Sequence, residues 1–186
     1  MSDTPPKVSA IIPTHDRPEL LRRAVESVVA QTYPRVELIV VDDGSHSPAK
    51  EAIESIDGIE DINYSVLNHD RPGGANAARN AGIDESSGDV LAFLDDDDVW
   101  EPTKLKRQVT AFGDADDHVG VVYTGIRQLG SDGRTNAVKT PEFAGDVTRR
   151  LLRGNFIGSF SAISVHSEVV SEVGRLDERL PNWQGW

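Results

Sequence analysis

Apolar residues in the first 112 positions occur in blocks with two different spacings. Almost continuous apolar runs lie at residues 8–12, 36–41 and 90–94. Such runs are typical of strands buried on both faces of a parallel sheet, and a weaker alternating run at 62–68 predicts one more strand. Helical spacing or helix-start signals occur at residues 18–29, 49–56, 75–83 and 101–112. This alternation of strand and helix predicts βαβ units and a mostly parallel sheet.

Several polar residues mark the expected helix ends. Asp16 is predicted to be the N-cap of the first helix, with Pro18 just inside and Glu19 at capping-box spacing. Asp146 is predicted to cap a short helix within 146–154, and Gly174 to end another within 167–174.

After residue 112 the βαβ pattern stops. Residues 119–140 predict a hairpin with its turn at Asp132 and Gly133, and residues 159–166 predict a strand. The fold class is therefore α/β, a three-layer α/β/α sandwich with a mostly parallel central sheet. We predict one domain over residues 1–186, with a Rossmann-like alternating half at 1–112 and a mixed second half at 113–186.

Composition excludes some classes of protein. The formal net charge of −12 argues against a general nucleic-acid binder, which needs a basic face. Cys is absent, so the chain has neither a disulfide framework nor a thiolate metal site. No apolar run is long enough for a bilayer and no signal peptide is visible, which favours a cytoplasmic location. The many acids and only 5 Lys are typical of proteins from salt-loving microbes, and an ordinary acidic cytoplasmic protein is the alternative.

Polar clusters follow three of the predicted strands. They are Pro13–Thr14, Asp42–Asp43–Gly44 and the four aspartates of "LAFLDDDDVW", Asp95 to Asp98. In open α/β sheets ligands bind beyond the carboxyl ends of the strands. We therefore expect the three clusters to meet at one rim.

The four aspartates predict a metal site. Between Arg79 and Lys104 the chain has eight acidic residues and no basic one, so local side chains are not expected to neutralise them. Hard carboxylate oxygens suit Mg²⁺ or Mn²⁺, and Mg²⁺ is commonly bound by one or two carboxylates plus substrate phosphates. On an extended segment Asp95 and Asp97 would face one way, and Asp96 and Asp98 the other. The alternative is a solvated acidic loop.

A glycine pair offers a second possible contact to phosphate. Gly73 and Gly74 precede the predicted helix at 75–83, whose N-terminal N–H groups favour anions, and Arg79 lies one turn in. A plain turn is the alternative, and no P-loop motif is present.

Taken together, three blocks of the sequence resemble a known family. They are "VSAIIPTHDRPELLRRAVESVVAQTYPRVELIVVDDGS", "GGANAARNAGIDESSGDVLAFLDDDDVWEPTKL" and "VGRLDERLPNWQGW". Their order and spacing are similar to those of the family 2 inverting glycosyltransferases of the GT-A fold. The resemblance implies a nucleotide-diphosphate-sugar donor, with a UDP-sugar favoured, and Mn²⁺ or Mg²⁺ as cofactor.

The resemblance also implies roles for individual residues. Asp97 is the favoured metal ligand and Asp95 the second choice. Both belong to a D-x-D motif whose middle residue, Asp96, faces ribose or sugar. Asp42 would receive the base, with Asp43 beside it. The remaining nucleotide-binding positions implied are Pro13, Thr14, Asp16, Gly74, Asn76 and Arg79.

The family's catalytic base is usually the Asp of a Glu-Asp pair, and here the chain departs from the pattern. The matching residues are Gln184 and Gly185, so the base is unknown and is expected at or beyond Gly185, with the acceptor half (113–186) truncated. The implied acceptor is a glycan, a polysaccharide or a lipid-phosphate-linked sugar. The basic patch Arg149, Arg150 and Arg153 could contact a lipid phosphate at the cytoplasmic face of the membrane, and an exposed helix face is the default.

Two other functions stay open at this point. A nucleotidyltransferase also uses a nucleotide and a metal, but it usually has a basic Gly-rich loop near the first strand, where "PTHDRPEL" has no glycine. A non-catalytic nucleotide-sugar or metal-binding module would not need the missing Glu-Asp pair.

Overall fold

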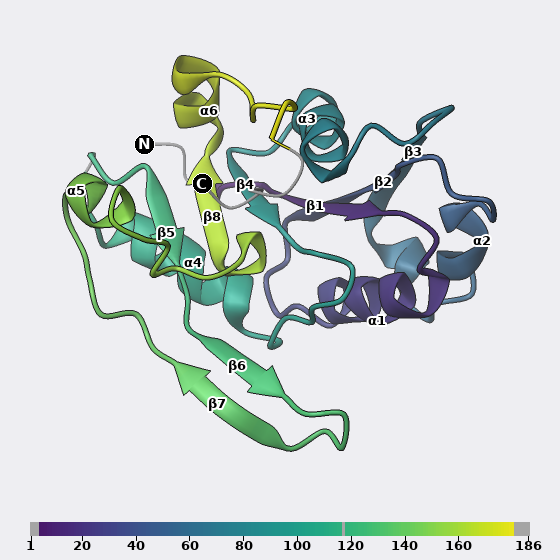
Figure 1. Ribbon diagram of the computed structural model, residues 1–186, viewed down its shortest axis with the longest axis horizontal. Helices are drawn as coiled ribbons and strands as arrows, with labels where there is room; N and C mark the ends of the chain where they lie inside the picture. Colours follow the sequence, from purple (N-terminus) through teal and green to yellow (C-terminus); the bar gives the residue numbers. More distant parts are fainter. Residues whose placement is uncertain (1–3, 117, 181–186) are drawn as a thin grey trace.

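A computed structural model describes residues 4–116 and 118–180. The central sheet has six strands in the order β3-β2-β1-β4-β8-β5 (Figure 1). Its four parallel strands are β1 (Val8–Thr14), β2 (Val36–Asp42), β3 (Asn63–Asn68) and β4 (Val90–Phe93). The fifth strand, β8 (Ile163–His166), runs antiparallel to β4 and to the edge strand β5 (Val121–Tyr123). The predicted α/β class with a mostly parallel sheet is confirmed.

Helices cover both faces of the sheet (Figure 1). One face packs against α1 (Pro18–Val29), α2 (Ala49–Ile53) and α4 (Lys104–Gly113). The other packs against α3 (Ala75–Glu85) and α6 (Ser167–Val173). Because successive side chains of a strand point to opposite faces, Ala10 and Ile12 join the first core while Ile11 joins the second. These three layers form the predicted sandwich.

The second half differs from the prediction in its strand pairing. The hairpin predicted over 119–140 is wrong in its first strand, which ends at Tyr123 and belongs to the central sheet as β5. The hairpin consists of β6 (Ile126–Leu129) and β7 (Thr135–Lys139), in a sheet of its own. The predicted strand is interrupted between β5 and β6 at Gly125, where a Cβ would lie 2.7 Å from the Lys139 carbonyl oxygen. The turn was predicted correctly, since Gly133 has a φ of +75° that favours glycine.

Helix ends were predicted with mixed success. The N-cap of α1 is Arg17 rather than Asp16, whose φ is +51° and whose carboxylate accepts a 2.7 Å hydrogen bond from the backbone N–H of His46. The N-cap of the four-residue α5 (Thr148–Leu151) is Val147, although Asp146 still accepts a hydrogen bond from the N–H of Thr148. Gly174 ends α6 as predicted. Two short 3₁₀ helices, η1 (Ile59–Asp61) and η2 (Phe160–Ala162), complete the described elements.

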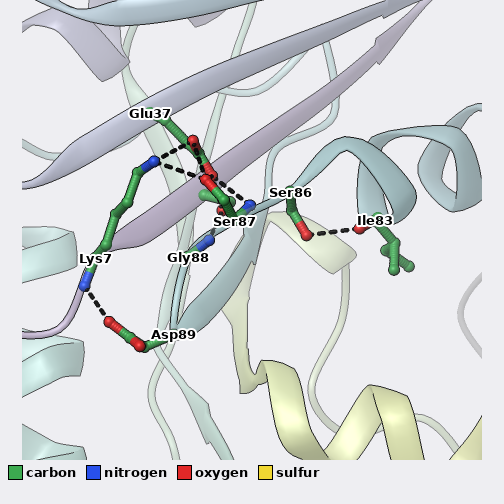
Figure 2. Close-up of polar contacts among 8 residues, drawn as sticks. Lys7, Glu37, Ile83, Ser86, Ser87, Gly88 and Asp89 are labelled. Carbon is green, nitrogen blue, oxygen red and sulfur yellow. Dashed lines mark hydrogen bonds and ion pairs between the residues drawn. The ribbon is translucent and has the colours of Figure 1, made fainter.

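An ionic cluster around the buried Glu37 joins the amino ends of the strands (Figure 2). Glu37 on β2 pairs with Lys7 and accepts hydrogen bonds from the Ser9 hydroxyl (2.5 Å) and the Ser87 N–H (2.7 Å). Burial raises the pKa of Glu37, but Lys7 and these hydrogen bonds outweigh it and lower the pKa to about 2. Asp89 accepts from the Lys7 N–H at 2.7 Å. The cluster fixes the loop between α3 and β4 at the end of the sheet opposite the rim.

Within the described residues, no helix is both long and apolar enough to cross a membrane.

Candidate active site

A cavity of about 360 Å³ opens at the carboxyl ends of the parallel strands. Its walls come from Pro13 and Thr14 at the end of β1, Asp43 after β2, Arg79 on α3, and the aspartates after β4. The convergence of the three polar clusters on one rim is therefore observed. Such a rim is where ligands bind in open α/β sheets.

The aspartates form a tight turn, not an extended segment. The Asp98 N–H donates to the Asp95 carbonyl at 3.0 Å, so the expected alternation of faces is wrong. Asp95, Asp96 and Asp97 line the cavity, while the Asp98 carboxylate lies 3.4 Å from the Ser159 hydroxyl. Burial raises the pKa of Asp98, and a hydrogen bond from Ser161 opposes that effect. The turn thus separates three cavity-facing acids from one that faces η2.

Two arginines partly neutralise the charge of this turn. This corrects the expectation that no side chain of the protein would neutralise the aspartates. Arg79 Nη2 lies 2.6 Å from Asp95 Oδ1. Arg17 Nη1 lies 3.1 Å from Asp96 Oδ1 and 3.7 Å from Asp97 Oδ2. Both arginines are distant in sequence from the aspartates, so only the fold brings them close.

The two arginines differ in burial. Arg79 is 3% exposed, donates to the Asn76 side chain at 3.2 Å, and has its guanidinium 4.3 Å from the centre of the Phe160 ring. Its Nε is the one buried side-chain nitrogen or oxygen without a hydrogen-bond partner among the residues the structure describes. The side chain of Arg17 is 53% exposed. Arg79 is therefore a fixed cation and Arg17 one with room to move.

Asp96 is the most constrained acid of the turn. Its side chain is 8% exposed, and its Oδ2 accepts a 2.8 Å hydrogen bond from the Thr14 hydroxyl. The contact joins the end of β1 to the turn after β4, so the positions of these two rim segments depend on each other.

Asp42 and Asp43 hold neighbouring loops through backbone hydrogen bonds. Asp42 accepts from the N–H groups of Ser45 (2.9 Å) and Ala49 (2.8 Å). Asp43 accepts from the N–H groups of Gly73 (2.9 Å) and Gly74 (2.7 Å), and it lies 2.7 Å from a ring nitrogen of His69. Asp43 lines the cavity, and Asp42 is buried behind it.

The predicted nucleotide-binding residues therefore divide into two groups. The group that lines the cavity is Pro13, Thr14, Asp43, Arg79 and Asp96. The group that lies outside the lining is Asp16, Asp42, Gly74 and Asn76. Sequence reasoning missed Arg17 as a lining residue. Its position between the first strand and the first helix, at the rim, was the signal that could have identified it from the sequence.

The donor groups fit a divalent cation that shares its ligands with a phosphate. No cluster of three or more His, Cys, Asp or Glu suited to a metal occurs among residues 4–116 and 118–180. Mg²⁺ is commonly bound by one or two carboxylates plus phosphate oxygens. Asp97 fits best, because its side chain is 57% exposed and Arg17 is 3.7 Å away, whereas Arg79 already occupies one oxygen of Asp95.

Comparison with known proteins identifies the family. The model of "Glycosyl transferase family 2" matches residues 9–169. The chain belongs to this family. Glycosyltransferase AglE of Haloferax volcanii is 33% identical over 182 residues, which cover 97% of the chain and 59% of AglE. A Campylobacter jejuni enzyme named GalNAc(5)-diNAcBac-PP-undecaprenol beta-1,3-glucosyltransferase is 38% identical over 93 residues, 50% of the chain and 30% of that enzyme.

Solved glycosyltransferase structures share the GT-A fold with the chain. Staphylococcus aureus TarS 1-349 superposes with a TM-score of 0.72 and 22% identity, over 96% of the chain and 52% of TarS 1-349. The mannosyltransferase PcManGT of Pyrobaculum calidifontis, in complex with GDP-Man and Mn²⁺, gives 0.70 and 18%, over 95% of the chain and 49% of PcManGT. Relatives matched over nearly the whole chain are longer proteins, of which it spans 26% to 59%.

The expected position of the catalytic base lies outside the described residues, since Gln184 and Gly185 fall in 181–186. Of the nearby acids, Asp177 accepts hydrogen bonds from the side chain and the N–H of Arg179, which lower its pKa to about 2. Glu178 accepts a 2.8 Å hydrogen bond from Asn80. The Asp177 contact lies within the turn after α6, whereas the Glu178 contact holds that turn against α3.

Proposed function

We propose that this chain forms the donor-binding part of a metal-dependent, inverting glycosyltransferase. The proposed reaction moves a sugar from a nucleotide-diphosphate donor, with a UDP-sugar favoured, to a glycan or lipid-linked acceptor. The observation that carries this proposal is the rim cavity of a family 2 member, in which three carboxylates and two arginines meet.

The charges of the cavity suit a diphosphate. Asp97 and Asp95 would hold Mn²⁺ or Mg²⁺, which would stabilise the negative charge of the departing nucleoside diphosphate. Arg17 is placed to meet a phosphate oxygen directly, because its side chain is half-exposed beside Asp97. Arg79 orients the carboxylate of Asp95, and Thr14 orients that of Asp96. These side chains are preorganised at the rim, so they would need little rearrangement when the donor binds.

The direction of attack follows from inversion in a single displacement. The acceptor hydroxyl would approach the face of the sugar opposite the diphosphate and lose its proton to a carboxylate. We place this base at or beyond Gly185. The described acids of the cavity serve the donor side, since Arg17 and Arg79 already pair with them.

The base of the nucleotide is proposed to be uracil, read by Asp42. TarS has been crystallised with UDP and with UDP-GlcNAc, which supports uridine, whereas the PcManGT complex contains GDP-Man. Asp42 lies behind the cavity wall, and both its oxygens accept backbone hydrogen bonds. Its proposed contact with the base would use the remaining lone pairs.

The acceptor is proposed to be a glycan, a polysaccharide or a sugar on a lipid phosphate, used at the cytoplasmic face of a membrane. The name of the Campylobacter relative describes an acceptor linked to undecaprenyl diphosphate. Arg150 and Arg153, the two members of the predicted basic patch that line a cavity, support an acceptor that carries negative charge.

Calorimetry with UDP tests the donor and metal assignments together. We expect Mn²⁺ to strengthen UDP binding to the wild-type chain, and Asp97→Asn to remove that effect while the far-UV circular dichroism stays unchanged. GDP is expected to bind more weakly than UDP, with a preference that Asp42→Ala reduces. Equal UDP affinity in Mn²⁺ and in EDTA would contradict the metal role, and tighter binding of GDP would contradict the role of Asp42.

A further inference from the structure

A second cavity lies in the acceptor half, away from the donor rim. It also measures about 360 Å³ and is lined by Phe143, Arg150, Arg153, Gly154, Asn155 and Phe156. It adjoins α5, which lies beside β5 at the sheet edge opposite β3 (Figure 1). The donor-binding residues described above are not part of it, so its chemistry is separate.

No acid among the described residues neutralises the arginines of this cavity. Neither Arg150 nor Arg153, nor Arg149 on the same turn, forms an ion pair with an acid in the described part of the chain. The Arg150 guanidinium instead lies 3.9 Å from the centre of the Phe143 ring. In a chain with a net charge of −12 and many available carboxylates, arginines without acid partners indicate a place for an external anion.

The aromatic wall of the cavity is held in place. The rings of Phe143 and Phe156 are 5.2 Å apart and nearly perpendicular, and Phe156 also packs against Tyr123 at 5.9 Å. The Tyr123 hydroxyl donates to the Phe143 carbonyl at 2.7 Å and accepts from its N–H at 3.2 Å. Asn155 closes the adjacent turn through two 2.9 Å hydrogen bonds with the backbone of Gly158. The cavity is therefore a built structure on which α5 presents its cations.

A short segment leads from this cavity to the donor rim. Phe156 lines the cavity, and four residues later the Phe160 ring lies against Arg79. Four residues of extended chain span at most about 14 Å. Ser159 in between lies 3.4 Å from the carboxylate of Asp98. A molecule bound at one end in this cavity can thus reach the donor site with a group that lies one or two sugar rings from the bound end.

We propose that this cavity binds the phosphate group of the acceptor through Arg150 and Arg153, with the aromatic wall receiving the apolar chain next to that phosphate. This inference rests on the proposed glycosyltransferase function and names the acceptor class. Arg150 on α5 and Arg153 on the hydrogen-bonded turn that follows it both line the cavity, and two guanidinium groups suit a phosphate dianion. Leu152 on the same turn is 81% exposed and adds apolar surface beside the cations.

Binding of small phosphates to the 186-residue chain tests the proposal. The probes are geranyl phosphate, inorganic phosphate and geraniol, each titrated by calorimetry without nucleotide. The variant is Arg150→Gln with Arg153→Gln. The matched control is Arg149→Gln, which removes the same charge from the same helix but does not line the cavity. Geranyl phosphate is expected to bind the double variant at least about tenfold more weakly than wild type, and to bind the control within about twofold.

Each outcome decides part of the proposal. Equal weakening by the control variant would show only a general effect of charge and would overturn the site, as would unchanged binding by the double variant. If inorganic phosphate binds as tightly as geranyl phosphate, the phosphate subsite stands and the role assigned to the aromatic wall is wrong. UDP with Mn²⁺ is titrated into the same samples. Failure of the wild-type chain to bind UDP would count against the proposed function. The phosphate titrations report on this cavity alone.

Discussion

The two halves of the chain, residues 4–112 and 113–180, are stabilised in different ways. Residues 4–112 contain nearly all the buried apolar side chains, and their strands are covered on both faces. Beyond residue 113, the fully buried residues of the described chain are Ser161, Ala162, Ser164 and Val165. The exposed large apolar side chains show the reverse distribution, since all except Val99 lie in the second half: Val121, Leu129, Val138, Leu152, Val173 and Leu180.

This difference puts the proposed donor site and the proposed acceptor site on different kinds of structure. The donor cavity is formed by strand ends whose side chains are fixed by buried contacts, as Thr14 and Asp96 illustrate. The second cavity is formed by a four-residue helix and loops attached to the sheet through β8. A rigid scaffold with variable loops lets one donor site serve many acceptors.

The largest expected effect compares one apolar side chain from each half. Ile11→Ala should lower the free energy of unfolding by about 2–5 kcal/mol, because Ile11 is fully buried beneath α3, where Gly82 allows close approach. Val138→Ala on β7 should change it by less than about 0.5 kcal/mol, since Val138 is 63% exposed. Urea denaturation of the two variants measures both values. Similar losses would show that the second half contributes a core of its own.

Lys104 lies between the halves and should make stability depend on alkaline pH. Burial lowers the pKa of Lys104 to about 7, although the Trp100 ring 4.0 Å from Nζ favours the charged form. Between pH 7 and 10.5 the unfolded chain then binds a proton that the folded chain lacks, so the free energy of unfolding rises with pH. The rise should be on the order of 3 kcal/mol between pH 7 and 10.

The matched variant Lys104→Met removes the titrating group. Its free energy of unfolding should stay nearly level over the same pH range in chemical denaturation. A rise as steep as that of the wild type would assign the pH dependence to another group.

The two arginines of the donor site provide a sharper comparison within one half. Arg79→Gln should destabilise the fold by about 2 kcal/mol, because it leaves the partly buried Asp95 without its cation. Arg17→Gln should lower the free energy of unfolding by less than about 1 kcal/mol, since the Arg17 side chain is half-exposed.

Arg17→Gln should also strengthen binding of Mn²⁺ alone while weakening binding of UDP. Paramagnetic resonance of free Mn²⁺ and calorimetry with UDP separate these two effects, and a loss of both affinities would make Arg17 a structural residue only.

The last expected effect concerns acid stability. The folded-state pKa of Glu37, about 2, lies below its usual 4.5, so its contribution is complete above pH 4.5 and is lost as the pH falls toward 2. Glu37→Gln should be less stable than wild type at pH 7, with a difference that shrinks below pH 4.5. Thermal melting at pH 7, 4 and 3 follows this difference. A constant difference across these pH values would mean that the ionised form of Glu37 is not the stabilising one.

The sequence predicted the strand ends better than the contacts between them. Continuous apolar runs identified β1, β2 and β4 because burial on both faces leaves a local signature. The pairing of Arg17 with Asp96 joins residues 79 positions apart, and no local pattern encodes it. Asp16 was predicted as a cap from its spacing, but its hydrogen bonds to His46, 30 positions away, prevailed. The insertion of β8 between β4 and β5 likewise depends on long-range pairing, so the second half was predicted less completely.

The position of β8 has a consequence for synthesis of the chain. β8 pairs with β4 on one side and β5 on the other, yet it follows both in sequence. About seventy residues separate Phe93 from Ile163, so at about 5–20 residues per second the β4 edge stays open for on the order of 4 to 14 s on the ribosome. An open apolar edge strand pairs readily with other chains. The nascent protein should therefore be most vulnerable to aggregation after β4 has emerged and before β8 closes the sheet, the interval in which a chaperone would protect it most.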